Sequence, residues 1–77
     1  MNATEFMQSE EFKRLVQKIE GYSKGFIFTL PIYKMSKAQK NGINIITRHC
    51  INSGIIQSIS VGLDISGGVT EETYIRL

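Results

Sequence analysis

The stretch that decides the fold is SKAQKNGINIITRHCINSG, residues 36–54. Ser36 is placed to accept a hydrogen bond from the amide of Gln39 while the glutamine side chain reaches back to the serine amide, the reciprocal pattern called a capping box. Gly54 follows Asn52 and Ser53 and is placed to end a helix. The stretch therefore predicts a helix that begins directly after Ser36 and ends before Gly54.

This helix is predicted to have one apolar and one basic side, because successive helical residues lie ~100° apart around the axis. The apolar arc holds Ala38, Gly42, Ile43, Ile45, Ile46, His49 and Cys50. The opposite arc holds Lys37, Lys40, Asn41, Asn44 and Arg48. We expect the first arc to pack on the rest of the chain and the second to face solvent.

Residues 9–20 predict an earlier helix. Its apolar residues Phe12, Leu15, Val16 and Ile19 have the spacing of one helical stripe. Ser9 is placed to cap the first turn. Phe6 and Met7 do not lie on this stripe, so we expect them in a short separate turn before Ser9.

Three segments alternate with the two-residue period of a β-strand: residues 25–33, 55–65 and 69–77. Pro31 has no amide hydrogen, which favours an edge position for the first strand. The other two form a hairpin around residues 66–68. A three-residue loop would set Ile65 opposite Val69, Ile59 opposite Ile75 and Ser60 opposite Tyr74, and the apolar pattern favours this register.

The predicted fold is a single α+β domain spanning residues 1–77, in the order helix, strand, helix, strand, strand. A right-handed crossover makes the first two strands parallel, and the third strand can pair between them. This gives a three-stranded sheet with both helices packed on one face. An uncovered face would favour contact with another protein. The predicted protein-interface residues are Ile27, Tyr33, Ile56 and Tyr74.

The composition excludes several kinds of site. The chain has one cysteine, Cys50, and one histidine, His49, so it can form neither an internal disulfide nor a Cys/His zinc set. As neighbours on a helix they point ~100° apart and do not form a nucleophile–base pair. The adjacent carboxylates need no catalytic explanation, because Glu10/Glu11 lie in the first turn of a helix and Glu71/Glu72 point to opposite faces of a strand. No glycine-rich phosphate-loop pattern occurs. We therefore expect no catalytic residue, metal or cofactor, and a protein that is not an enzyme.

The start of the chain turns polar at Asn2, and its most apolar segment, residues 26–33, is much shorter than the ~20 residues of a membrane span. We expect a cytoplasmic protein without a membrane partner.

The net charge is only +2, yet no acidic residue occurs between Glu20 and Asp64. The candidate nucleic-acid or anion-binding residues are Lys34, Ser36, Lys37, Lys40, Asn44 and Arg48. Lysine and arginine can contact phosphates and asparagine can contact base edges. The alternative interpretation is a solvated face of an amphipathic helix with no partner.

Three hypotheses follow. The first is a non-enzymatic regulatory or inhibitory module that acts by protein–protein contact as a homodimer, of the accessory kind common in bacteria and phages. The second is a nucleic-acid-binding protein that uses the basic face of the second helix. The third and weaker one is a small anionic ligand bound at the N-terminus of that helix.

Overall fold

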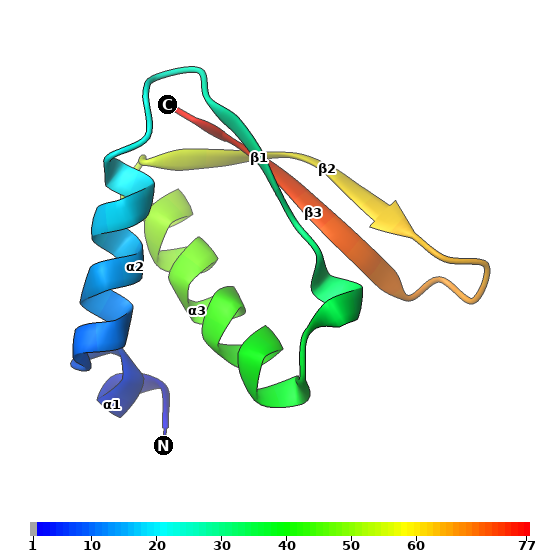
Figure 1. Cartoon of the computed structure of the whole chain (residues 1–77), viewed down its shortest axis with the longest axis horizontal. Helices are drawn as coiled ribbons and strands as arrows, with labels where there is room; N and C mark the ends of the chain where they lie inside the picture. Colours follow the sequence, from blue (N-terminus) through cyan, green and yellow to red (C-terminus); the bar gives the residue numbers. More distant parts are fainter. Residues whose placement is uncertain (1) are drawn as a thin grey trace.

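The computed structural model describes residues 2–77 and has the predicted order of elements (Figure 1). The helices are α1 (Ala3–Met7), α2 (Glu10–Glu20) and α3 (Lys37–Asn52), with a 3-10 turn, η1 (Ile32–Lys34). The strands are β1 (Ile27–Leu30), β2 (Ile56–Leu63) and β3 (Val69–Arg76). The α+β prediction is confirmed, and none of the described helices is long and apolar enough to cross a membrane.

The sheet has the strand order β1-β3-β2, with β3 antiparallel to both neighbours. The last strand therefore lies between the first two, which run parallel to each other, as predicted. Strand β1 is shorter than the predicted strand because the chain turns at Pro31 into η1. Helices α2 and α3 pack on one face of the sheet, so the molecule has two layers (Figure 1).

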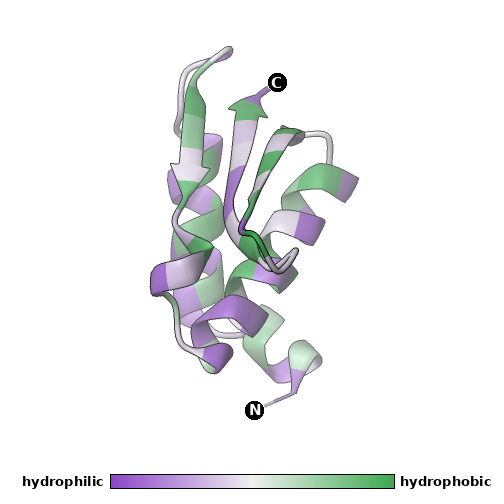
Figure 2. Cartoon of the chain, turned by 90° about the vertical axis from the view of Figure 1, so that its right-hand side faces the viewer, coloured by the Kyte–Doolittle hydropathy of each residue, from purple (hydrophilic) through white to green (hydrophobic). Residues whose placement is uncertain are grey.

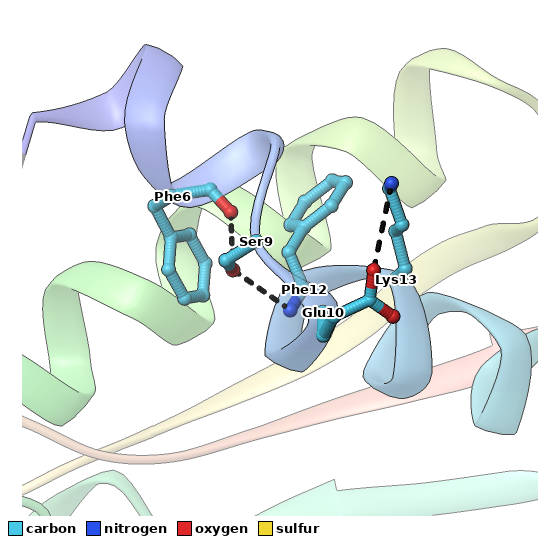
Figure 3. Close-up of polar contacts among 5 residues, drawn as sticks. All are labelled: Phe6, Ser9, Glu10, Phe12 and Lys13. Atoms are coloured by element: carbon cyan, nitrogen blue, oxygen red, sulfur yellow. Dashed lines mark hydrogen bonds and ion pairs between the residues drawn. The ribbon is translucent and has the colours of Figure 1, made fainter.

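Ser9 caps the start of α2, as the sequence predicts (Figure 3). The Ser9 hydroxyl accepts a hydrogen bond from the Phe12 amide at 3.2 Å and donates one to the Phe6 carbonyl at 2.6 Å. It thereby joins the end of α1 to the start of α2. Glu10 and Lys13 are 3.9 Å apart across the first turn, an exposed pair that contributes little to stability. Phe6 and Met7 lie in the separate short helix that the sequence predicts.

The core lies between the two helices and the sheet. Its buried apolar residues are Phe12, Val16, Ile32, Ile46, Cys50, Ile56 and Tyr74. Cys50 is fully buried, and this burial raises the pKa of its thiol. The prediction that Ile56 and Tyr74 lie on the open face is wrong, because they are only 1% and 5% exposed. They point from β2 and β3 toward the helices.

The predicted hairpin register is also wrong. In the structure Leu63 lies opposite Val69 and Ser58 opposite Tyr74, with irregularities between Ser58 and Ser60 and between Gly62 and Leu63. Ile59, which the sequence pattern pairs with Ile75, is the extra residue of the first irregularity and stays half exposed.

The loop explains this register because Asp64 folds it into five residues, 64–68. The Asp64 carboxylate accepts hydrogen bonds from the Ser66 amide at 2.9 Å, the Ser66 hydroxyl at 2.7 Å and the Gly68 amide at 2.8 Å. The bonds from Ser66 and Gly68 lower the pKa of Asp64. Gly67 has a φ of +86°, which glycine adopts without steric cost.

The end of the β2–β3 hairpin extends beyond the helices (Figure 1). The radius of gyration is 12.7 Å, compared with about 11.5 Å for a compact chain of this length. We call residues 59–69 the hairpin arm. Its exposed apolar side chains are Ile59, Val61, Leu63, Ile65 and Val69. Viewed from the arm, apolar residues recur along the strands of the sheet (Figure 2).

Candidate nucleic-acid interface

The interface candidate is the outer side of α3, and its position follows from the two ends of that helix. The Ser36 amide donates to Gln39 Oε1 at 2.9 Å, and the Gln39 amide donates to Ser36 Oγ at 3.2 Å. The predicted capping box is therefore present. At the other end Gly54 has a φ of +74°, and the chain then turns into β2. The helix is held at both ends by local hydrogen bonds and backbone conformation.

The inner side of α3 is fixed by burial. Ile46 is 2% exposed and Cys50 is 0% exposed, and both belong to the core cluster with Ile56 and Tyr74. Thr47 is also buried, which the sequence pattern did not indicate. Its hydroxyl lies 3.0 Å from the carbonyl of Ile43, one turn back, so the polar group is satisfied within the helix. This burial fixes the rotation of α3 and decides which residues face outward.

All the predicted basic residues are exposed. The outer side of α3 carries Lys37, Lys40, Asn41, Asn44 and Arg48, with Lys34 just before it in η1 and Ser36 at the cap. From Lys37 to Arg48 the face runs about 16 Å along the axis at 1.5 Å per residue. Across residues 2–77 the ion pair found is that of Glu10 with Lys13, so the cations of α3 have no carboxylate within 4.0 Å. The face is positive and unneutralised.

Lys34 has a different setting from the other cations. Its ammonium group lies 5.6 Å from the centre of the Tyr33 ring, within the range of a cation–π contact. Tyr33 is itself 60% exposed. The two side chains form an exposed cation–aromatic pair in η1, which lies against β3 and comes two residues before α3 in the chain.

The predicted protein-interface residues do not form one surface. Ile27 is 57% exposed on the edge strand β1 and Tyr33 lies in η1, whereas Ile56 and Tyr74 are in the core. The Tyr74 hydroxyl donates to Glu72 Oε1 at 2.7 Å. Burial, and secondarily this bond, raises the pKa of Tyr74 to about 12. Tyr74 is therefore a structural residue with its hydroxyl satisfied.

The hairpin arm does not follow from the sequence pattern. The pattern predicts that Ile59 and Ile65 lie on a packed face, but Ile59 is 50% exposed and Ile65 is fully exposed. The length of the strands is the feature that indicates the arm. Strands β2 and β3 have eight residues each and extend beyond the helices that cover them (Figure 1).

The residue types that could support catalysis or metal binding occupy structural positions. The His49 ring packs edge-on against the Phe12 ring, with the ring centres 5.2 Å apart. Within residues 2–77 no three histidine, cysteine or acidic side chains gather as a metal site would require. Two surface hollows, of about 390 and 300 Å³, flank Phe6 where it lies on Gly42 of α3. Asn41 of the outer side of α3 also lines the smaller hollow, which therefore reaches the edge of the basic face.

Comparison of the chain with protein-family models, with curated proteins and with solved structures finds no match. The function is therefore inferred from the residues of this chain.

Proposed function

We propose that this protein is a non-enzymatic nucleic-acid-binding module that contacts its ligand through the outer face of α3. The observation that carries the proposal is the separation of the helix into a buried apolar side and a fully exposed side with lysine, arginine and asparagine and no acid. Such a face attracts phosphates, and displacement of their counterions favours binding.

The way α3 is presented also supports the proposal. Helix α3 is 16 residues long, or about 24 Å, and its apolar side is held by α2 and the sheet. The major groove is ~12 Å wide and admits one α-helix.

The residues divide into two roles on this proposal. Lys34, Lys37 and Lys40 contact phosphates, which set position without reading sequence. Asn44 and Arg48 lie one turn apart and offer an amide and a guanidinium to base edges, where asparagine pairs with adenine and arginine with guanine. The hairpin arm does not share this role, since the charged residues of the hairpin before Arg76 are Asp64, Glu71 and Glu72.

The test is the salt dependence of binding to a mixed-sequence duplex, measured by fluorescence anisotropy. Three lysines on phosphates would give a slope of log affinity against log salt of about −2.7, or a loss of about 40-fold between 50 and 200 mM salt. The double variant Lys40→Glu/Arg48→Glu should abolish binding. Because it lowers the net charge by four, its control is Lys18→Glu/Lys24→Glu, which makes the same change off this face and should leave most of the affinity.

An affinity that does not depend on salt concentration, or that falls equally in both double variants, would refute the proposal. The first result would mean that phosphates are not contacted, and the second that only net charge matters.

Protein–protein contact in a regulatory or inhibitory homodimer is the second candidate, and the exposed apolar side chains of the arm favour it. Half of the residues first expected to form that surface are buried, so the candidate now rests on the arm. Capture of a small anion at the start of α3 receives no added support. There the Ser36 amide already donates to Gln39 Oε1, and the Gln39 amide donates to Ser36 Oγ.

A further inference from the structure

We propose that the hairpin arm is an interface between two copies of this chain, which pair antiparallel along the outer edge of β2. The inference does not depend on nucleic-acid binding, and it gives the protein-contact candidate a defined partner. Strand β2 is an edge of the sheet, with β3 on one side. Within residues 2–77 no other strand pairs with its outer edge.

The edge of β2 lacks two common protections, charge and proline. Exposed edges are commonly kept from pairing by charged side chains, proline, short length or β-bulges. Strand β2 reads IQSISVGL, eight residues without a charge or a proline. The other edge strand, β1, has four residues and is followed directly by Pro31. The bulge at Ile59 bends β2, but the strand continues past it through Ser60 and Val61 to Leu63.

The sequence of β2 suits a second copy of itself. In a two-fold dimer each residue of one strand faces a residue of the same strand in the partner, so the surface must be self-complementary. A two-fold axis at Ser60 sets Ile59 opposite Val61 and Ser60 opposite its own equivalent. Apolar side chains then face apolar side chains. No like charges meet, which in an antiparallel pair would be destabilising.

The exposed apolar area of the arm is also of the order found in protein–protein interfaces. The five exposed apolar side chains of the arm present on the order of 500 Å² per copy, compared with the ~800 Å² per partner of a standard interface. The backbone of β2 supplies further area. Within residues 2–77 the core is small, with seven buried apolar residues. Covering the arm would add apolar burial, which a domain of this size otherwise lacks.

Sedimentation velocity of the full chain between about 1 and 100 µM tests the proposal, since a standard-size interface can have a micromolar dissociation constant. We expect a dimer, and at least about tenfold weaker association for Val61→Lys, because two lysines would then face apolar side chains across the axis. The matched control is Ile27→Lys on β1, the other edge, where the side chain is 57% exposed against 50% for Val61. It should leave the dimer intact.

A monomer at every concentration, or equal weakening by both substitutions, would overturn the proposal. Should Val61→Lys lose its folded circular dichroism spectrum, a cysteine variant decides instead. Paired strand residues have Cα atoms ~4.5–5.5 Å apart, within the range of a disulfide. Ser60→Cys should therefore cross-link two copies under mild oxidation, while Thr29→Cys on β1 should not. Cys50 does not compete, since it is fully buried. Equal cross-linking by both variants, or by neither, would also reject the β2 interface.

Discussion

Replacement of Ile56 by alanine should be the most informative single change in this fold, because the sequence pattern placed this residue on the open face and the structure places it in the core. Ile56 is 1% exposed and belongs to the cluster with Ile46, Cys50 and Tyr74. Removing the buried side chain of an isoleucine costs about 2–5 kcal/mol, from lost burial and the cavity left behind. A 77-residue domain has only about 4–12 kcal/mol of stability in total.

The matched control is Ile65→Ala, the same change at a side chain that is fully exposed in the loop. A surface substitution of this kind should change the free energy of unfolding by less than ~0.5 kcal/mol. Urea unfolding followed by circular dichroism measures both. For a slope of about 1 kcal/mol per molar urea, a cost of 3 kcal/mol lowers the midpoint by about 3 M for Ile56→Ala. Ile65→Ala should barely move it.

The two experiments are run at the lowest usable protein concentration and repeated tenfold higher, because dimer formation makes apparent stability depend on concentration. Equal effects of the two substitutions at the lower concentration would refute the strand register described above. So would a cost below ~1 kcal/mol for Ile56→Ala.

Two further predictions concern β3. The pKa of Tyr74 is raised to about 12 from its ordinary value of 10, so the stability linked to this group is fully present below pH 10 and is lost as pH rises from 10 to about 12. Tyr74→Phe should therefore flatten this part of a plot of melting temperature against pH. An unchanged fall would refute the assignment of this pH dependence to Tyr74. The Arg76 guanidinium donates to the Glu20 carbonyl at 3.2 Å and the Ile55 carbonyl at 3.3 Å, so Arg76→Met should cost about 1–2 kcal/mol through the lost charged hydrogen bonds at the C-terminus of α2. Urea unfolding with Lys18→Met as the control measures it, and equal costs would show that Arg76 acts through charge alone.

Local signals in the sequence predicted the helices well. Ser9 and Ser36 each cap a helix through a hydrogen bond to a residue three positions on, and both bonds form as predicted. Such contacts need no knowledge of the rest of the chain. The strand order was also predictable, because a right-handed crossover leaves a place between the first two strands for the third.

The hairpin register was not predictable from the alternation of apolar residues. The Asp64 side chain organises a five-residue loop, and two irregularities shift the pairing on the way along β2. Each shift changes which side chains face the helices. Apolar alternation also assumes that a covered face exists along the whole strand, whereas Ile65 lies beyond the helices with nothing over it.

For the candidate site, the sequence predicted the basic face of α3 correctly because the helical period alone separates Lys40 and Arg48 from Ile46 and Cys50. It placed Ile56 and Tyr74 wrongly because the facing of a strand residue depends on packing across the sheet. The hairpin arm was missed for the same reason.

Thiol labelling of Cys50 can measure the folding equilibrium of this protein. A thiol reagent reacts with the thiolate of an accessible cysteine, and this side chain is fully buried between α3 and the sheet. The rate of labelling of the native protein therefore reports how often the core opens, and no engineered probe is needed. Because the cysteine is the chain's only one, a single reaction gives the opening free energy of the element that carries the basic face.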